Sequence, residues 1–190
     1  MTKTLSQGMS KRAFLKRSGL VGASLLAPTL PFYIAEAKTF LTIEQAQEIL
    51  LPDSTFDVQE VILSKEQRKS IAKTSKTRVR SDTIRGWVTA EKHWFIVDQI
   101  IGKHENIDMA FAIDNQGAVI GLEVLTYRET YGHEIRHPKW REQFVGLNGN
   151  EHLKLNRQIK NISGATLSCR HVTDGVNRLL TTWQEVLQHV

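Results

Sequence analysis

Three runs of apolar and β-branched residues limit the fold of this chain more than any other feature. They are Trp94–Val97, Met109–Ile113 and Ala118–Leu125, and short runs of this composition are typical of buried strands. Asp114–Gly117 separates the last two runs and supplies the residues that tight turns prefer, which predicts an antiparallel hairpin. We therefore expect a mostly antiparallel sheet within Arg85–Tyr127.

Helical patterns lie on both sides of this central region. Residues 41–50 and 63–72 each show helical spacing behind a capping residue, Thr42 and Ser64 respectively. A short helix is expected near Pro138–Phe144. A long final helix, with one face on the sheet, is predicted by apolar residues at helical intervals: Leu167, Val172, Val176, Leu179, Leu180, Trp183, Val186 and Leu187. Several helices and a mostly antiparallel sheet make an α+β domain with a C-terminal helix.

The first 37 residues have the three parts of an export signal. A basic stretch, Ser10–Arg17, precedes a moderately apolar stretch, Ser18–Ala35, and Ala35-Glu36-Ala37 gives the small-x-small pattern that signal peptidase cleaves. The basic stretch contains SKRAFLK, which resembles a twin-arginine signal with Lys11 in place of the first arginine. We expect cleavage after Ala37 and a periplasmic or other extracytoplasmic location; an uncleaved signal would instead anchor the protein in the membrane.

The charge of the chain argues against a nucleic-acid partner. Of the formal net charge of +5, +4 comes from residues 1–37, where five basic residues stand against Glu36 alone. The basic run Lys73–Arg80 has no interleaved aromatic residues, so we interpret it as a solvated loop or strand edge. The single cysteine, Cys169, cannot form an intramolecular disulfide, and we expect a small buried residue at the start of the final helix rather than a reactive thiol.

Small and hydroxylated residues stand together directly before the final helix. Ser163-Gly164-Ala165-Thr166 occurs within NISGATLSCRH. The first amide hydrogens of a helix lack intrahelical partners and the helix dipole is positive there, so such a segment favours an anion, phosphate above all. Ser163 or Thr166 could instead cap the helix, which stabilises by about 1 kcal/mol. From these residues alone, both interpretations stay open.

The SGAT sequence and its surroundings resemble the flavinylation motif of the FMN-binding domain family. Its members include the covalent-flavin subunits of sodium-pumping NADH:quinone oxidoreductases and related electron-transport complexes, and the resemblance runs from about Trp94 to Leu187. It implies that Thr166 carries FMN through a phosphoester bond installed by a flavin transferase. It also implies that the cofactor is surrounded by Ser163, Gly164, Ala165, Leu167 and Ser168. On this interpretation residues 1–37 are the export signal, 38–84 an N-terminal helical region and 85–190 the FMN-binding core.

Two positions differ from the pattern of the family. The broader motif often has an acidic residue where this chain has Lys160, a residue that is either solvated or a counter-charge to the phosphate. A loop similar to Glu129-Thr130-Tyr131-Gly132 lies against the flavin ring in the family, with proline frequent at the position of Tyr131. The resemblance implies that Tyr131 stacks on the ring or hydrogen-bonds to it, although a turn with an exposed aromatic residue is the alternative. Trp140 and Arg141 either complete the wall of the site or, for Trp140, belong to the core with Phe144.

These features together predict an exported electron carrier with no catalytic or metal-binding residues of its own. The expected partners are a flavin transferase and membrane or periplasmic redox proteins, such as a cytochrome, a reductase or a quinone-linked complex; the oligomeric state stays open. Two alternatives remain: a flavin-dependent reductase subunit that acts on a substrate, and a non-redox exported binding module in which SGAT caps a helix. Ser168, His171 and Asp174 are too crowded on one helical turn to serve as a hydrolase triad.

Overall fold

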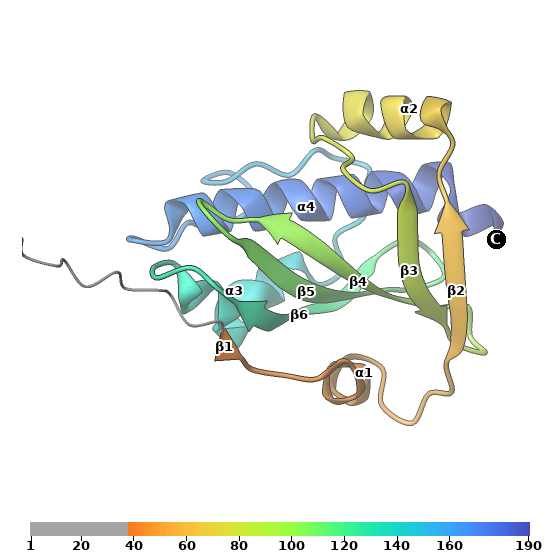
Figure 1. Ribbon diagram of the computed structural model, residues 1–190, viewed down its shortest axis with the longest axis horizontal. Helices are drawn as coiled ribbons and strands as arrows, with labels where there is room; N and C mark the ends of the chain where they lie inside the picture. Colours follow the sequence, from red (N-terminus) through yellow and green to blue (C-terminus); the bar gives the residue numbers. More distant parts are fainter. Residues whose placement is uncertain (1–37) are drawn as a thin grey trace, which may run out of the picture. The chain divides into compact units, whose positions relative to one another are not determined.

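A six-stranded sheet forms the centre of the part of the chain that the structure describes, residues 38–190 of a computed structural model (Figure 1). The export signal predicted for residues 1–37 lies outside these residues. Every neighbouring pair of strands is antiparallel, in the order β1-β6-β5-β4-β3-β2. The strands are β1 Lys38–Thr39, β2 Asp57–Ile62, β3 Thr83–Val88, β4 Trp94–Ile101, β5 Asn106–Ile113 and β6 Val119–Tyr127.

The predicted hairpin joins β5 to β6. At the turn, the Asp114 carboxylate accepts hydrogen bonds from the backbone N–H groups of Gln116 and Ala118, each at 2.8 Å. Gly117 has a φ of +84°, a conformation that residues with a Cβ rarely adopt. The turn chemistry of Asp114–Gly117 therefore fixes this connection, and the prediction of an antiparallel hairpin is confirmed.

Helices cover both faces of the sheet. The α-helices are α1 Ile43–Leu50, α2 Lys65–Ser75, α3 Pro138–Arg141 and α4 Thr166–Glu185, and the 3₁₀ segments are η1 His133–Arg136, η2 Glu142–Phe144 and η3 Leu187–His189. Figure 1 shows α4 along one face with α2 beside it, and α1 below the other face. This arrangement confirms the α+β class. Within residues 38–190, no helix is both long and apolar enough to span a membrane.

The two faces of the sheet carry separate cores. Between the sheet and α4, residues such as Val176 and Leu180 pack in one cluster with Phe111. On the opposite face, Ala46 of α1 packs with Phe95 and with small residues of β5. The predicted apolar face of α4 is buried except at its first position, because Leu167 is 43% exposed. Cys169 is buried at the start of α4, as expected.

Residues 38–84 hold strands as well as helices, which differs from the helical region predicted there. Capping boxes at Thr42 with Gln45 and at Ser64 with Gln67 begin α1 and α2 as expected. Between these helices, however, β2 pairs with β3 and forms one edge of the sheet. No side chain of β2 is fully buried, and its apolar residues Val58, Val61 and Ile62 do not alternate with polar ones, so it lacks the alternation that reveals a strand in a sequence.

Candidate functional site

The SGAT segment forms a tight turn that leads directly into α4. Ser163 and Gly164 are exposed and Ala165 is buried. Gly164 has a φ of +87°, and a Cβ at this position would meet no atom within 4 Å. The glycine is therefore required by the backbone conformation and not by lack of space. Its conformation brings Thr166 to the first turn of the helix.

Among residues 38–190, no side chain caps the N-terminus of α4. Ala165 is the N-cap residue, and no side chain accepts a hydrogen bond from the first turn there. The alternative in which Ser163 or Thr166 caps the helix is therefore wrong in this structure. The first-turn N–H groups of a 20-residue helix, together with its dipole, are left for solvent or for an anion.

Thr166 is half-buried and its hydroxyl is held by a neighbour. The side-chain amide of Asn161 donates from Nδ2 to Thr166 Oγ1 over 2.9 Å. The segment before the motif is held in turn by a backbone bond from Ala165 N–H to Ile162 O of 3.1 Å. The position of the predicted attachment oxygen is thus defined by local contacts.

The second predicted segment, Glu129–Gly132, lies against the first turn of α4 (Figure 1). The Tyr127 hydroxyl donates to the carbonyl of Tyr131 over 2.5 Å and lies 3.0 Å from Ser168 Oγ. Gly132 has a φ of +93°, and a Cβ there would overlap Ser168 Oγ. Burial raises the pKa of Tyr127, so its hydroxyl keeps the proton that it donates to Tyr131 O. The structure thus brings together two segments that are far apart in the sequence.

Within this loop, Glu129 and Tyr131 are placed very differently. The Glu129 carboxylate points to the β4–β5 connection, where its Oε1 accepts from His104 N over 2.5 Å and from Glu105 N over 3.0 Å. Burial opposes ionisation of Glu129, but backbone N–H groups of this connection outweigh it and the pKa is lowered. Tyr131 is 82% exposed, and Thr130 is exposed as well. Glu129 therefore fixes the loop, whereas Tyr131 is free to contact a bound group.

A cavity of about 500 Å³ lies directly beside the segment that leads into the motif. Its wall is tied to that segment, because Trp140 Nε1 donates to Lys160 O over 2.7 Å and Gln143 Oε1 accepts from Lys160 N over 2.8 Å. One carboxylate oxygen of Glu134 is buried and has no hydrogen-bond partner within residues 38–190. The lining residues are Glu134, His137, Lys139, Trp140, Gln143, Lys160 and Ile162. The volume suits a small organic ligand.

Trp140 both lines the cavity and belongs to the core, the two roles that the sequence left open for it. Arg141 does not line the cavity. Trp140 is buried and packs edge-to-face on Phe144 with a centroid distance of 5.2 Å, while its ring also lines the cavity. Arg141 points to the sheet, where it pairs with Glu123 and donates to Leu122 O. Trp140 therefore belongs to the wall and to the core, and Arg141 anchors the short α3 to β6.

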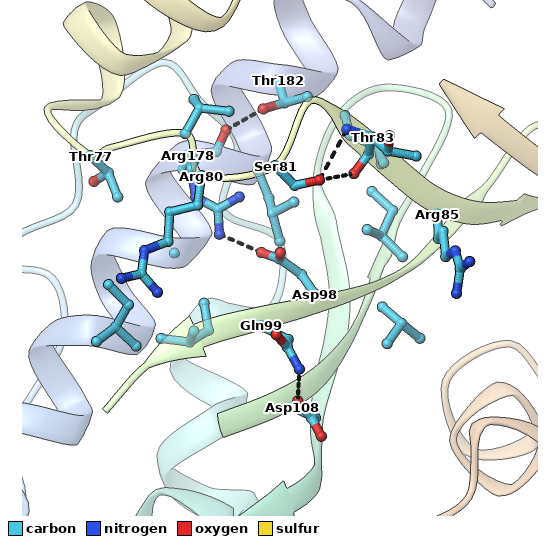
Figure 2. Close-up of a pocket in the computed structure, with 18 of the residues that line it drawn as sticks. Thr77, Arg80, Ser81, Thr83, Arg85, Asp98, Gln99, Asp108, Arg178 and Thr182 are labelled. Carbon is cyan, nitrogen blue, oxygen red and sulfur yellow. Dashed lines mark hydrogen bonds and ion pairs between the residues drawn. The ribbon is translucent and has the colours of Figure 1, made fainter. Parts of the chain in front are cut away.

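A larger cavity of about 1180 Å³ lies between α4, β4 and the loop before β3 (Figure 2). Arg178 of α4 reaches Asp98 of β4 across it in an ion pair. No residue of the SGAT segment or of the Glu129–Gly132 loop lines it. Of the two cavities, the smaller one is therefore the neighbour of the predicted attachment site.

The Ser168 hydroxyl is engaged with Tyr127, so Ser168, His171 and Asp174 do not form a triad. Within residues 38–190, no group of three or more His, Cys, Asp or Glu side chains is arranged to hold a metal ion. Of the predicted cofactor-binding residues, Gly132 lies against Ser168 at the start of α4, whereas the Glu129 side chain is directed to the β4–β5 connection.

Comparison with known proteins gives a family match over this part of the chain. Residues 102–181 match the family model of the FMN-binding domain. The matched segment includes β5, β6, the Glu129–Gly132 loop, the smaller cavity, the SGAT segment and most of α4. No curated protein matches the chain. The match confirms the resemblance predicted from the motif, and residues 102–181 are identified as an FMN-binding domain.

Proposed function

We propose that this protein is an exported electron carrier that holds FMN on Thr166 through a phosphoester bond. The observation that carries the proposal is the uncapped N-terminus of α4, which begins at the threonine that the motif assigns as the attachment residue. A phosphodiester at Thr166 keeps one negative charge. The free first-turn N–H groups and the helix dipole favour that charge by about 0.3–1 kcal/mol, and by up to about 2 kcal/mol where the site is partly buried.

The residues around the motif also suit the flavin ring. Trp140 and Ile162 supply apolar surface in the smaller cavity, next to the chain segment that ends at Thr166. Tyr131, exposed on a loop that is tied to Ser168, supplies an aromatic side chain that is free to cover a bound ring. When bound, FMN supplies reversible transfer of one or two electrons. The residues of this chain then bind the ring, limit its contact with water and set its potential.

A covalent attachment suits an exported protein. A flavin lost outside the cytoplasm is not readily replaced, and a tether also fixes the ring for electron transfer. The proposal therefore includes export directed by residues 1–37 to the periplasm or another extracytoplasmic space, with membrane anchoring if the signal is retained. The proposed partners are a flavin transferase and membrane or periplasmic redox proteins, such as a cytochrome, a reductase or a quinone-linked complex.

A flavin-dependent reductase subunit is the second candidate. Electron transfer between partners needs no general acid or base, and none is required from the residues around Thr166. If the purified flavoprotein reduced a small substrate repeatedly without a redox partner, the second candidate would be favoured over a carrier.

Intact-mass spectrometry tests the attachment. The protein is exported from a host that has a flavin transferase, and wild type is compared with Thr166→Ala and with Ser163→Ala. We expect wild type and Ser163→Ala to gain one FMN minus one water, and Thr166→Ala to gain nothing. Flavin that stays on Thr166→Ala after denaturation would contradict the proposal.

A further inference from the structure

We propose that Asn161 positions the Thr166 hydroxyl for attachment of FMN and afterwards donates a hydrogen bond to the ester oxygen. This inference rests on the proposed function, because it concerns the same attachment site. Its starting point is the 2.9 Å contact from Asn161 Nδ2 to Thr166 Oγ1. Asn161 lies outside SGAT, and no pattern in the sequence assigns it a role.

The direction of this hydrogen bond suits the chemistry of attachment. While Oγ1 accepts from Asn161, the threonine proton points elsewhere and is accessible to a base of the transferase. In the transfer, Oγ1 forms a bond to the phosphorus of the FMN half of FAD. The pyrophosphate bond breaks, AMP leaves with the electron pair, and the threonine proton passes to the base. No oxidation or reduction occurs in this step.

The same donor remains suitable after the bond has formed. An ester oxygen has no hydrogen and can only accept, so a side chain that donates to Oγ1 fits both the free and the esterified threonine. With the opposite orientation of the amide, Oδ1 would accept the threonine proton, a contact that esterification destroys. Asn161 is therefore suited to its role by its N–H group, which an aspartate at this position lacks when ionised.

Hydrogen bonds to the backbone of Lys160 fix the position of the neighbouring Asn161. Lys160 N donates to Gln143 Oε1 over 2.8 Å and Lys160 O accepts from Trp140 Nε1 over 2.7 Å. These two bonds connect Lys160 to η2 through its N–H group and to α3 through its carbonyl. The polar contact to Thr166 thus comes from Asn161. The Lys160 side chain is exposed, although the family often has an acidic residue at this position.

A second observation points to a ligand at Asn161. Its Oδ1 is buried and has no hydrogen-bond partner among the described residues. Buried polar atoms are nearly always paired, so an unpaired amide oxygen beside the attachment oxygen indicates an acceptor that is left for a donor from outside the chain. The ribityl chain of FMN carries hydroxyl groups of the required kind. An amide that donates to Oγ1 and accepts from the cofactor would use both ends of its side chain.

The test measures loading of the full unloaded chain by a purified flavin transferase with FAD. Initial rates of FMN incorporation, followed by flavin fluorescence of the denatured protein and by intact mass, give kcat and KM for the chain. The variants are Asn161→Ala, the isosteric Asn161→Asp, and Asn150→Ala as an exposed control asparagine that precedes the motif. Thermal unfolding of each unloaded variant shows whether the fold is intact.

We expect kcat for Asn161→Ala and Asn161→Asp to fall roughly five- to tenfold, the effect of about one hydrogen bond, with KM within twofold of wild type. Asn150→Ala should load like wild type. If Asn161→Asp folds and loads at the wild-type rate, the inference is wrong while Thr166 remains the attachment site. If wild type itself gains no FMN, the proposed function fails and the inference fails with it.

Discussion

Removal of the Tyr127 hydroxyl tests the contact that joins the Glu129–Gly132 loop to α4. This hydroxyl donates to Tyr131 O over 2.5 Å and lies 3.0 Å from Ser168 Oγ. Tyr127→Phe keeps the buried ring, so no cavity forms and only the two hydrogen bonds are lost. At about 0.5–1.5 kcal/mol for each bond, the free energy of unfolding should fall by about 1–3 kcal/mol.

Urea unfolding at neutral pH measures this difference. The matched control is Tyr131→Phe, because the Tyr131 side chain is 82% exposed and its hydroxyl makes no hydrogen bond among the described residues. The control should lie within about 0.5 kcal/mol of wild type, as surface substitutions usually do. If Tyr127→Phe were as stable as the control, the Tyr127 hydroxyl would not hold the loop against α4 and the geometry of the candidate site would need another cause.

Three further predictions concern the fold around the site. Gly164→Ala should destabilise by about 1 kcal/mol or more in urea, because φ is +87° although space is available; an unchanged midpoint would contradict the strain argument. The pKa of Glu129 is lowered from 4.5, so its ionised form stabilises the fold above that pH and the contribution is lost on acidification. Glu129→Gln should therefore lower the urea midpoint at pH 7, and this difference should shrink as the pH falls below 4.5 and through the lowered pKa; a difference that stays constant over this range would refute this. Cys169 is fully buried and burial raises its pKa, so a thiol reagent should modify it only after denaturation, and rapid labelling of the folded protein would show that the start of α4 opens.

Features set by local chemistry could be predicted from the sequence. The capping boxes at Thr42 and Ser64 begin their helices where expected, because each cap depends only on residues within one turn. The turn at Asp114 follows in the same way from its own carboxylate. The motif before α4 and the family could also be recognised, since SGAT and the strands before it lie in the matched segment.

Features set by contacts between distant residues could not be predicted. The apolar residues of the strand β2, Val58, Val61 and Ile62, do not alternate with polar ones, and none is fully buried, so its sequence carries no periodic signal. The sequence allowed Ser163 or Thr166 to cap α4, but the left-handed turn at Gly164 places Ala165 at the cap position. The Tyr127–Ser168 contact and the Asn161–Thr166 bond depend on how these turns are placed in space.

Tandem mass spectrometry of the tryptic peptide that carries the motif identifies the residue to which FMN is attached. Cleavage after Lys160 and Arg170 releases NISGATLSCR, which contains three hydroxyl residues, Ser163, Thr166 and Ser168. For protein exported in the presence of a flavin transferase, we predict that the added FMN fragments with Thr166 alone. An unmodified peptide, or FMN on either serine, would contradict the account.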